Sequence, residues 1–234
     1  MRIEINPAYK KLEQFINDLP ALFNTTGETI YEGRNILKRY VIDENLTIVV
    51  KRFKIPHLLN QFVYGSIRHS KARRSFIYAK KLLERGISTP TPIAYIEQFN
   101  WGLKDSYYIS VESPLKRIIR EFWDNPTIGD RTFILEAFGR MTAKMHKKGV
   151  VHLDYSAGNI LFDIVNDKLD FTIVDVNRIK FGRVSEKEGY ANLNRLWLND
   201  DAYKIISSAY AKTLNYDSSY AEEKILYYKR KVMK

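Results

Sequence analysis

The chain has 234 residues, of which 45% are hydrophobic and 28% are charged, a composition typical of a folded globular protein. Lys and Arg outnumber Asp and Glu by 38 to 27, which gives a formal net charge of +11. The lack of cysteine excludes a disulfide scaffold and a thiolate zinc site. The N-terminal residues lack the apolar stretch of a signal peptide, and no later run approaches the length of a membrane span. We therefore expect a cytoplasmic protein.

The N-terminal half is predicted to be rich in strands. Short apolar runs alternate there with turn residues, and a Thr-Pro-Thr-Pro segment forces an extended connection before a hairpin. The expected elements are a helix over residues 8–17 that Pro20 ends, strands over 36–42 and 46–53, a helix over 66–84, and a hairpin of strands 93–99 and 106–112.

The pattern becomes mostly helical after Pro126. A helix is predicted from Asp130, as its cap, to about Lys148. Its expected buried stripe follows an i+4 spacing: Phe133, Ala137, Met141 and Met145. Two apolar strands around a polar turn follow, and then three helices. The chain is therefore predicted to be an α+β protein with two lobes, residues 1–112 and residues 113–234.

The positive charge is concentrated in one part of the sequence. Residues 34–85 contain thirteen Lys or Arg and three acidic residues, a local balance of +10. Such a distribution favours a polyanionic partner: nucleotide phosphates, an acidic sugar, an anionic membrane surface or nucleic acid. A basic helix face kept only for solubility is the alternative. Nucleic acid is not expected, because the sixteen tyrosines are scattered and are typical of core positions.

The strongest chemical pattern lies between residues 150 and 177. His152 and Asp154 are followed by Asn159 and, two strands later, by Asp175. Phosphoryl transfer uses these residue types in this order. Asp154 would accept the proton of the attacking hydroxyl, Asn159 and Asp175 would hold Mg²⁺, and His152 would hold the loop by hydrogen bonds. A capped helix end, a turn Asn and a loop Asp are the alternative explanation.

A nucleotide site is predicted in the N-terminal half. Lys51 lies near the end of an apolar strand, where kinase folds place the ammonium that binds the α- and β-phosphates. Gly33 lies in a turn whose N–H groups would cover phosphates, although an ordinary hairpin turn has the same pattern. Order along the chain places the segment that would bind the adenine edge near Val111 and Glu112.

Together with these motifs, residues 70–97, 173–182 and 192–197 resemble the bacterial lipopolysaccharide kinase (Kdo/WaaP-like) family. The resemblance covers about residues 45–200. It implies a two-lobed protein-kinase-like fold, with an antiparallel sheet and one helix in the first lobe and a reduced, mostly helical second lobe.

The resemblance also implies an activity. Members of the family phosphorylate a hydroxyl of an inner-core lipopolysaccharide sugar, Kdo or a heptose, with ATP and Mg²⁺ at the cytoplasmic face of the inner membrane. It implies that Lys51 binds ATP phosphates, that Asp154 is the base, and that Asn159 and Asp175 hold the metal. The expected partners are ATP and an anionic or lipid-linked sugar, with peripheral contact to an anionic membrane.

Two departures from kinase patterns keep alternatives open. Kinase folds pair the strand lysine with a helix glutamate, but the predicted helix offers only Glu84, at its far end. Glu112 is another candidate, or the pair is missing. A glycine-rich phosphate loop is also absent. A pseudokinase or nucleotide-binding scaffold therefore remains an alternative, as does a kinase of another metabolite or of a protein.

Overall fold

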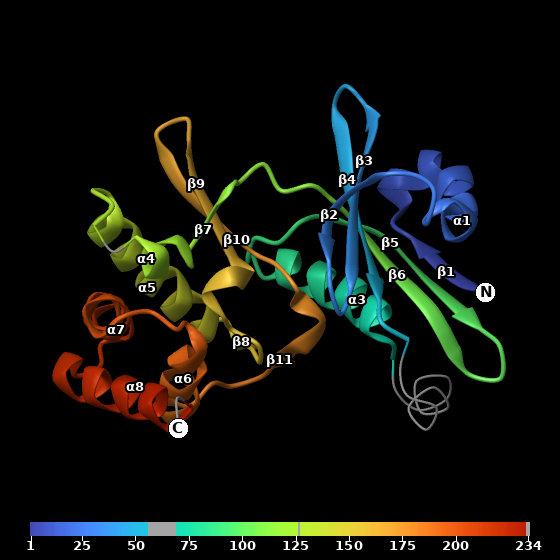
Figure 1. Cartoon of the computed structure of the whole chain (residues 1–234). Coiled ribbons are helices and arrows are strands. Elements are labelled where there is room, and N and C mark those ends of the chain that lie inside the picture. Colours follow the sequence, from blue (N-terminus) through green and yellow to red (C-terminus); the bar gives the residue numbers. More distant parts are fainter. Residues whose placement is uncertain (56–68, 126, 233–234) are drawn as a thin grey trace. The chain divides into compact units, whose positions relative to one another are not determined.

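The computed structural model describes residues 1–55, 69–125 and 127–232. The first residues of the helix predicted from residue 66 lie outside these ranges. Contacts divide the chain into two compact units, residues 1–113 and 114–234 (Figure 1). Within the described residues, no helix combines the length and the apolar character that crossing a bilayer requires.

Unit 1 is built on an antiparallel sheet with the strand order β1-β5-β6-β4-β3-β2. The four strands predicted from apolar runs between turn residues are present as β3, β4, β5 and β6. In chain order the strands are β1 (Arg2–Ile5), β2 (Glu28–Glu32), β3 (Ile36–Asp43), β4 (Leu46–Phe53), β5 (Pro92–Phe99) and β6 (Leu103–Val111).

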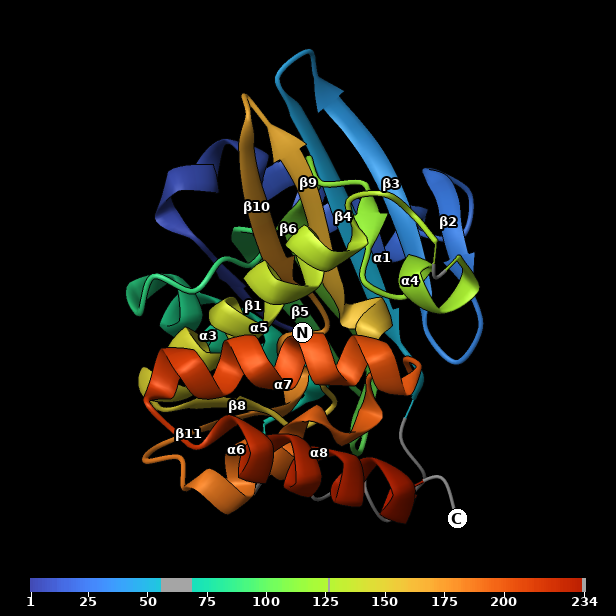
Figure 2. The ribbon, with the colours of Figure 1, turned by 90° about the vertical axis from the view of Figure 1, so that its left-hand side faces the viewer.

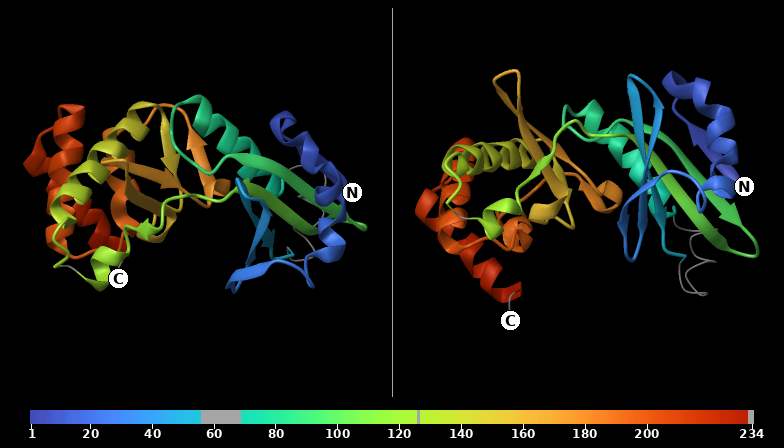
Figure 3. Two further views of the ribbon diagram at one scale, coloured as in Figure 1. Left: turned by 90° about the horizontal axis from the view of Figure 1, so that it is seen from above. Right: turned by 45° about the horizontal axis from the view of Figure 1, so that its top comes forward.

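Two helices cover opposite faces of this sheet (Figure 3). The 3-10 turn η1 (Pro7–Leu12) and helix α1 (Glu13–Leu22) pack on the side of Val50, whereas α3 (Lys71–Glu84) packs on the side of Phe53. Successive side chains of a strand point to opposite faces. The central strand β4 therefore contributes to the apolar layers beneath both helices.

Helix α1 does not end at Pro20, as predicted from the sequence, but continues to Leu22. Pro20 cannot donate the hydrogen bond that would reach the carbonyl of Ile16. Ile16 and Leu19 are fully buried against the sheet, and Phe23 N still donates to Leu19 O at 2.8 Å. We infer that the packing of this apolar face outweighs the loss of one hydrogen bond.

Unit 2 contains two small sheets and a group of helices. Its three-stranded sheet has the order β10-β9-β7, and its two-stranded sheet pairs β11 with β8. The long helix α7 packs against both α5 and α8 (Figure 2). The elements are β7 (Arg117–Ile118), α4 (Glu121–Asp124), α5 (Arg131–Lys147), β8 (Val150–His152), η2 (Ala157–Asn159), β9 (Ile160–Val165), β10 (Lys168–Ile173), η3 (Val176–Arg178), β11 (Ile179–Phe181), α6 (Glu186–Asn192), η4 (Leu193–Arg195), α7 (Asp200–Leu214) and α8 (Ser218–Val232).

The buried stripe predicted for α5 was wrong. Phe133 is 55% exposed, and Met145 is the only member of the predicted stripe that is buried. An i+4 spacing advances about 40° around the helix at each step, so twelve residues drift by about 120°. The buried face instead follows mixed i+3 and i+4 steps: Ile134, Leu135, Phe138, Gly139, Thr142, Ala143, Met145 and His146.

Asp130 precedes α5 as predicted, but its side chain makes no capping hydrogen bond. Its carboxylate accepts from the guanidinium of Arg117, which also donates to Glu121. This contact lowers the pKa of Asp130. Arg117 lies 4.6 Å from the centroid of the Phe162 ring. The charge network therefore ties β7, α4 and the start of α5 to the three-stranded sheet.

The close packing of α5 against α7 predicts an unusual effect of alanine at Gly139. Alanine normally stabilises a helix interior relative to glycine by about 1 kcal/mol. At Gly139, however, an added Cβ would lie 2.6 Å from the carbonyl oxygen of Ile206. We expect Gly139→Ala to lower the free energy of unfolding by about 1–3 kcal/mol, as measured by urea denaturation. Gly129→Ala is the control, since nothing lies within 4 Å of its Cβ position. Equal effects of the two changes would contradict this account.

Candidate active site

A buried histidine joins the two loops that carry the predicted site residues of unit 2. His152 ends β8 and is fully buried. Its Nε2 lies 3.2 Å from the carbonyl oxygen of Val174, and the backbone N–H of Asp154 donates to its Nδ1 at 3.1 Å. One donor and one acceptor are what a neutral imidazole offers, so these partners assign the Nε2–H tautomer. Burial lowers the pKa of His152, which favours the same neutral form.

The two predicted metal ligands lie on adjacent strands. Asn159 directly precedes β9, and Asp175 follows β10 after one residue. The β9–β10 pairing continues beyond the strands, because Val174 N donates to Asn159 O at 2.9 Å. The Asn159 side chain donates from Nδ2 to Asp154 O at 2.9 Å. The structure thus brings His152, Asp154, Asn159 and Asp175 together through a few hydrogen bonds.

The donor atoms of this pair suit a hard divalent cation. With Nδ2 of Asn159 bound to Asp154 O, its Oδ1 remains as a neutral oxygen ligand. Asp175 adds a carboxylate, one oxygen of which accepts from Asn177 Nδ2. Among the described residues, no group of three or more His, Cys, Asp or Glu forms a complete metal cage. Mg²⁺ usually keeps several waters and takes only one or two protein carboxylates together with substrate phosphates, so it does not need such a cage.

The backbone at Asp175 is left-handed, with φ 56° and ψ 46°. Aspartate adopts this region more readily than most residues, but at a cost in free energy. Strained residues of this kind cluster at functional sites, where the surrounding structure holds them. Here the holding contacts are the flanking hydrogen bonds at Val174 and Asn177.

The Asp154 carboxylate lies between two arginines. Arg195 Nη1 is 3.7 Å from its Oδ1, and Arg178 Nη1 is 3.9 Å from its Oδ2. Both distances exceed those of hydrogen bonds, and no hydrogen bond to this carboxylate occurs within the part of the chain that the structure describes. Its oxygens can therefore accept a proton from a hydroxyl that approaches the loop.

A chain of hydrogen bonds connects the backbone of His152 to side chains of the helices. Asn192 donates from Nδ2 to His152 O at 2.8 Å and, through Oδ1, contacts His146 Nε2 at 3.0 Å. His146 Nδ1 in turn lies 2.8 Å from the hydroxyl of Tyr210. Gly189 leaves room for this contact, because a Cβ there would lie 2.2 Å from the Tyr210 hydroxyl oxygen. Helices α5, α6 and α7 thereby fix the backbone of the loop.

Sequence reasoning missed the residues that surround the motif from His152 to Asp175. Two of the family-like stretches, residues 173–182 and 192–197, do carry them. Asn177 and Arg178 follow Asp175 in the first stretch, whereas Asn192 and Arg195 belong to the second. The clustering of Asn and Arg in these stretches was the only sequence signal for these residues, but it did not indicate which site residue each of them contacts.

In unit 1, Lys51 and Arg52 point to opposite faces of the sheet, as strand alternation predicts. The guanidinium of Arg52 lies over the Phe23 ring on the α1 side and donates to Asn24 at 2.8 Å. The ammonium of Lys51 lies 5.2 Å from the centroid of the Phe53 ring, which belongs to the apolar cluster under α3. Lys51 therefore shares the α3 face, on the central strand β4.

Backbone hydrogen bonds limit how the predicted adenine segment could contact a base. The backbone N–H groups of Val111 and Glu112 already donate to Thr91 O and Thr47 O, each at 2.9 Å. They are therefore not available to donate to a base edge. The turn of Gly33 lies at the other end of β4, where Lys54 N donates to Asn35 Oδ1 at 3.3 Å. Gly33 N itself donates to Asn35 O at 3.1 Å.

Neither acid considered as a partner for Lys51 is well placed for that role. Glu84 is the last residue of α3 and is exposed, and the inward face of that helix carries no acid. The Glu112 carboxylate accepts from Arg39 Nε at 3.0 Å. This ion pair also raises the pKa of Arg39. The lysine–glutamate pair of kinase folds therefore has no counterpart on α3.

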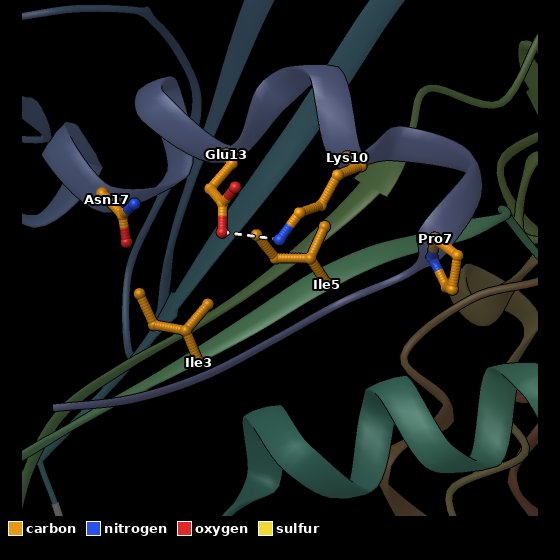
Figure 4. A pocket seen from close by; sticks show the side chains of 6 residues that line it. All are labelled: Ile3, Ile5, Pro7, Lys10, Glu13 and Asn17. Carbon is orange, nitrogen blue, oxygen red and sulfur yellow. Dashed lines mark hydrogen bonds and ion pairs between the residues drawn. The ribbon is translucent and has the colours of Figure 1, made fainter.

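A pocket beside β1 is less suited to bind a charged ligand than the region around Asp154 and Asp175 (Figure 4). Its two charged lining residues, Lys10 and Glu13, pair with each other at 2.7 Å. The pair leaves no uncompensated charge toward a ligand.

Comparison with solved structures defines the class of fold. A structure described as WaaP in complex with acyl carrier protein matches 99% of this chain and 98% of its own, with a TM-score of 0.67 and 18% identity. The chain thus has a protein-kinase-like fold, with the antiparallel sheet in unit 1 and a mostly helical unit 2. The family model described as the lipopolysaccharide kinase (Kdo/WaaP) family matches residues 49–209, and the chain belongs to this family.

Curated relatives match over shorter stretches. The chain is 31% identical over 114 residues to a 3-deoxy-D-manno-octulosonic acid kinase of Stenotrophomonas maltophilia (strain K279a), which covers 47% of this chain and 42% of that protein. It is 27% identical over 106 residues to the protein of the same description in Xanthomonas campestris pv. campestris (strain B100), covering 44% and 41%. The match spans about two fifths of each relative's length.

The buried histidines predict that stability falls in mild acid. Burial lowers the pKa of His146 to about 4, whereas an unfolded histidine has a pKa near 6.5. The unfolded chain therefore binds more protons as the pH falls below about 6.5, and the native state loses stability. Between pH 7 and pH 5 we expect the free energy of unfolding to drop by about 2 kcal/mol more in the wild type than in His146→Gln.

Urea denaturation at the two pH values measures this difference. His69→Gln is the matched control, since His69 is exposed, and we expect it to keep most of the wild-type pH dependence. If His146→Gln retained the full pH dependence, the buried neutral histidine would not be its source.

Proposed function

We propose that the chain is an ATP- and Mg²⁺-dependent kinase that phosphorylates a hydroxyl of a lipopolysaccharide inner-core sugar, Kdo or a heptose. The main support is the juxtaposition that His152 maintains, with a carboxylate on one loop and two oxygen ligands beside it. Family membership agrees with this chemistry, because the family is described as lipopolysaccharide kinases.

In this proposal Asp154 is the base. It takes the proton of the sugar hydroxyl while that oxygen forms a bond to the γ-phosphorus of ATP, and the bond between this phosphorus and the bridging oxygen breaks to release ADP. Mg²⁺ bound by Asn159 and Asp175 would supply positive charge to the phosphate oxygens. Arg178 and Arg195 keep the carboxylate oriented, and their charges favour an anionic reaction centre.

The face of unit 1 that carries Lys51 suits a nucleotide. Val111 pairs with Ile48 in the sheet, and Lys51 lies three residues further along β4, roughly 10 Å at the rise of a strand. The turn of Gly33 lies beyond Lys51. This order would place the adenine near Val111, the phosphates near Lys51, and the turn over the phosphates. Since the N–H groups of Val111 and Glu112 donate elsewhere, their carbonyl oxygens would contact the base.

A second candidate function is a nucleotide-binding scaffold without catalysis. The observation that favours it is the inward face of α3, which carries no acid, so that this helix lacks the glutamate of the kinase lysine–glutamate pair. Nucleotide binding without ADP production from any inner-core sugar would select this function over the kinase.

Replacing either carboxylate tests the assigned chemistry. We expect Asp154→Asn and Asp175→Asn to reduce kcat for phosphoryl transfer to Kdo by at least about a thousandfold, because they remove the base and the charged metal ligand. Thermal melting should change little. Asp167→Asn is the control, as Asp167 lies in a left-handed turn position that suits Asn. If the two variants kept wild-type kcat, the assigned roles would be wrong.

We also propose that exposed cations on α3 attract an anionic membrane. They are Lys80 and Lys81 near its C-terminal end, and they are joined by Arg85, which directly follows the helix. Electrostatic attraction of this kind amounts to about 1 kcal/mol per cation near the surface and weakens with salt.

Co-sedimentation with phosphatidylglycerol-containing vesicles tests this attraction. We expect binding at low salt to fall at least tenfold when the three residues become Ser. The matched control replaces three exposed lysines at the end of α5: Lys144, Lys147 and Lys148. Equal losses in both triple variants would argue against a specific role of α3.

A further inference from the structure

Unit 2 contains a pocket of about 530 Å³ directly beside the Asp154 loop. One wall is the backbone of that loop, where Ser156 N donates to Asp154 O at 2.9 Å. Another part of the lining comes from α4, shown in Figure 2, and from Arg120, which directly precedes it; Arg120 N donates to Ala157 O of the loop at 3.2 Å. The lining residues are Arg120, Trp123, Ser156, Ala157, Gly158, Leu196 and Trp197.

Two of the three tryptophans of the chain line this pocket. Trp123 is 50% exposed and Trp197 is 43% exposed, although tryptophan is usually largely buried. Trp197 also has a left-handed backbone, with φ 56°. Its neighbours Leu196 and Leu198 are buried in the core. The chain thus holds a strained conformation that leaves a large aromatic ring at the pocket rather than in the core.

The pocket carries positive charge without a compensating acid among its lining residues. The backbone of Arg120 is fixed, but its exposed guanidinium makes no ion pair or hydrogen bond with any residue that the structure describes. An anionic ligand therefore matches the charge of this pocket better than a neutral or cationic one.

Aromatic rings, an arginine and polar backbone together match an acidic sugar. The C–H face of a sugar ring packs against an aromatic ring, whose face is electron-rich, and its hydroxyls need polar partners. A guanidinium binds a carboxylate through two parallel N–H groups. We propose that this pocket is the acceptor subsite: the tryptophans stack on the sugar ring, Arg120 binds a sugar carboxylate, and a hydroxyl faces Asp154.

The proposed orientation of a sugar hydroxyl toward Asp154 rests on the proposed kinase function. The binding of an acidic sugar in the pocket does not rest on it. The subsite also separates the two acceptors proposed above. Kdo has a carboxylate for Arg120 and a heptose has none, so the pocket favours Kdo.

Tryptophan fluorescence in the absence of nucleotide measures binding directly. The probe is free Kdo, and mannose is the neutral comparison. We expect saturable quenching by Kdo, with a Kd at least tenfold below that for mannose. Trp197→Asn, which suits the left-handed backbone, and Arg120→Met should each raise the Kd for Kdo at least tenfold. Trp197→Tyr, which keeps an aromatic ring, should retain most of the wild-type affinity for Kdo.

Matched controls exist for both changes. Trp101 is also exposed and left-handed, at 89% and φ 59°, but it lies in the β5–β6 turn of unit 1. Arg183 is an exposed arginine of unit 2 that does not line the pocket. Trp101→Asn and Arg183→Met should leave the Kd within twofold. If Trp197→Asn fails to fold in a thermal melt, Trp123→Ser serves in its place, with the same expected loss.

The outcomes separate this proposal from the kinase proposal. An unchanged Kd in the pocket variants, equal binding of Kdo and mannose, or no saturable quenching would overturn the subsite. Kdo phosphorylation with an unchanged KM in those variants would leave the kinase standing without this subsite. Kdo binding that depends on Trp197 and Arg120, without any phosphoryl transfer by the wild type, would support the subsite and reject the kinase.

Discussion

The arrangement of the candidate active site depends on one buried imidazole. His152 accepts a hydrogen bond from the loop of Asp154 and donates one to the strand that leads to Asp175. Only the neutral Nε2–H form can do both, and burial favours that form by lowering the pKa. Asn192, His146 and Tyr210 extend the same chain of hydrogen bonds into three helices. The helical part of unit 2 can therefore be understood as the support of two short loops.

Much of the local structure follows from the sequence. Apolar runs between turn residues predicted β4 to the residue and β3 to within one residue of its end. The buried face of α5 was predicted wrongly, since fixed i+4 steps drift around a helix. The contact of α5 with α7 also depends on Gly139, which an apolar pattern does not indicate. The end of α1 was also missed, because packing against the sheet outweighs the effect of Pro20.

The residues of the site that could be predicted belong to a compact motif. Its members lie within about two dozen positions and are connected by one hairpin, so strand pairing alone brings Asn159 and Asp175 together. The supporting residues could not be predicted in the same way. Asn192 reaches His152 across 40 positions and Tyr210 reaches His146 across 64, and these contacts exist only once the helices have packed. The same holds for the pocket, whose two tryptophans come from α4 and from the segment before α7.

The protonation state of His152 tests the central claim most directly. Nitrogen-15 NMR of the imidazole rings distinguishes the two neutral tautomers and the charged form, and loss of a signal in His152→Gln assigns the ring. At pH 6.5, where an ordinary histidine is half charged, the account predicts a neutral ring with its proton on Nε2. A charged ring, or a proton on Nδ1, would contradict it, because Nδ1 could then not accept from the N–H of Asp154.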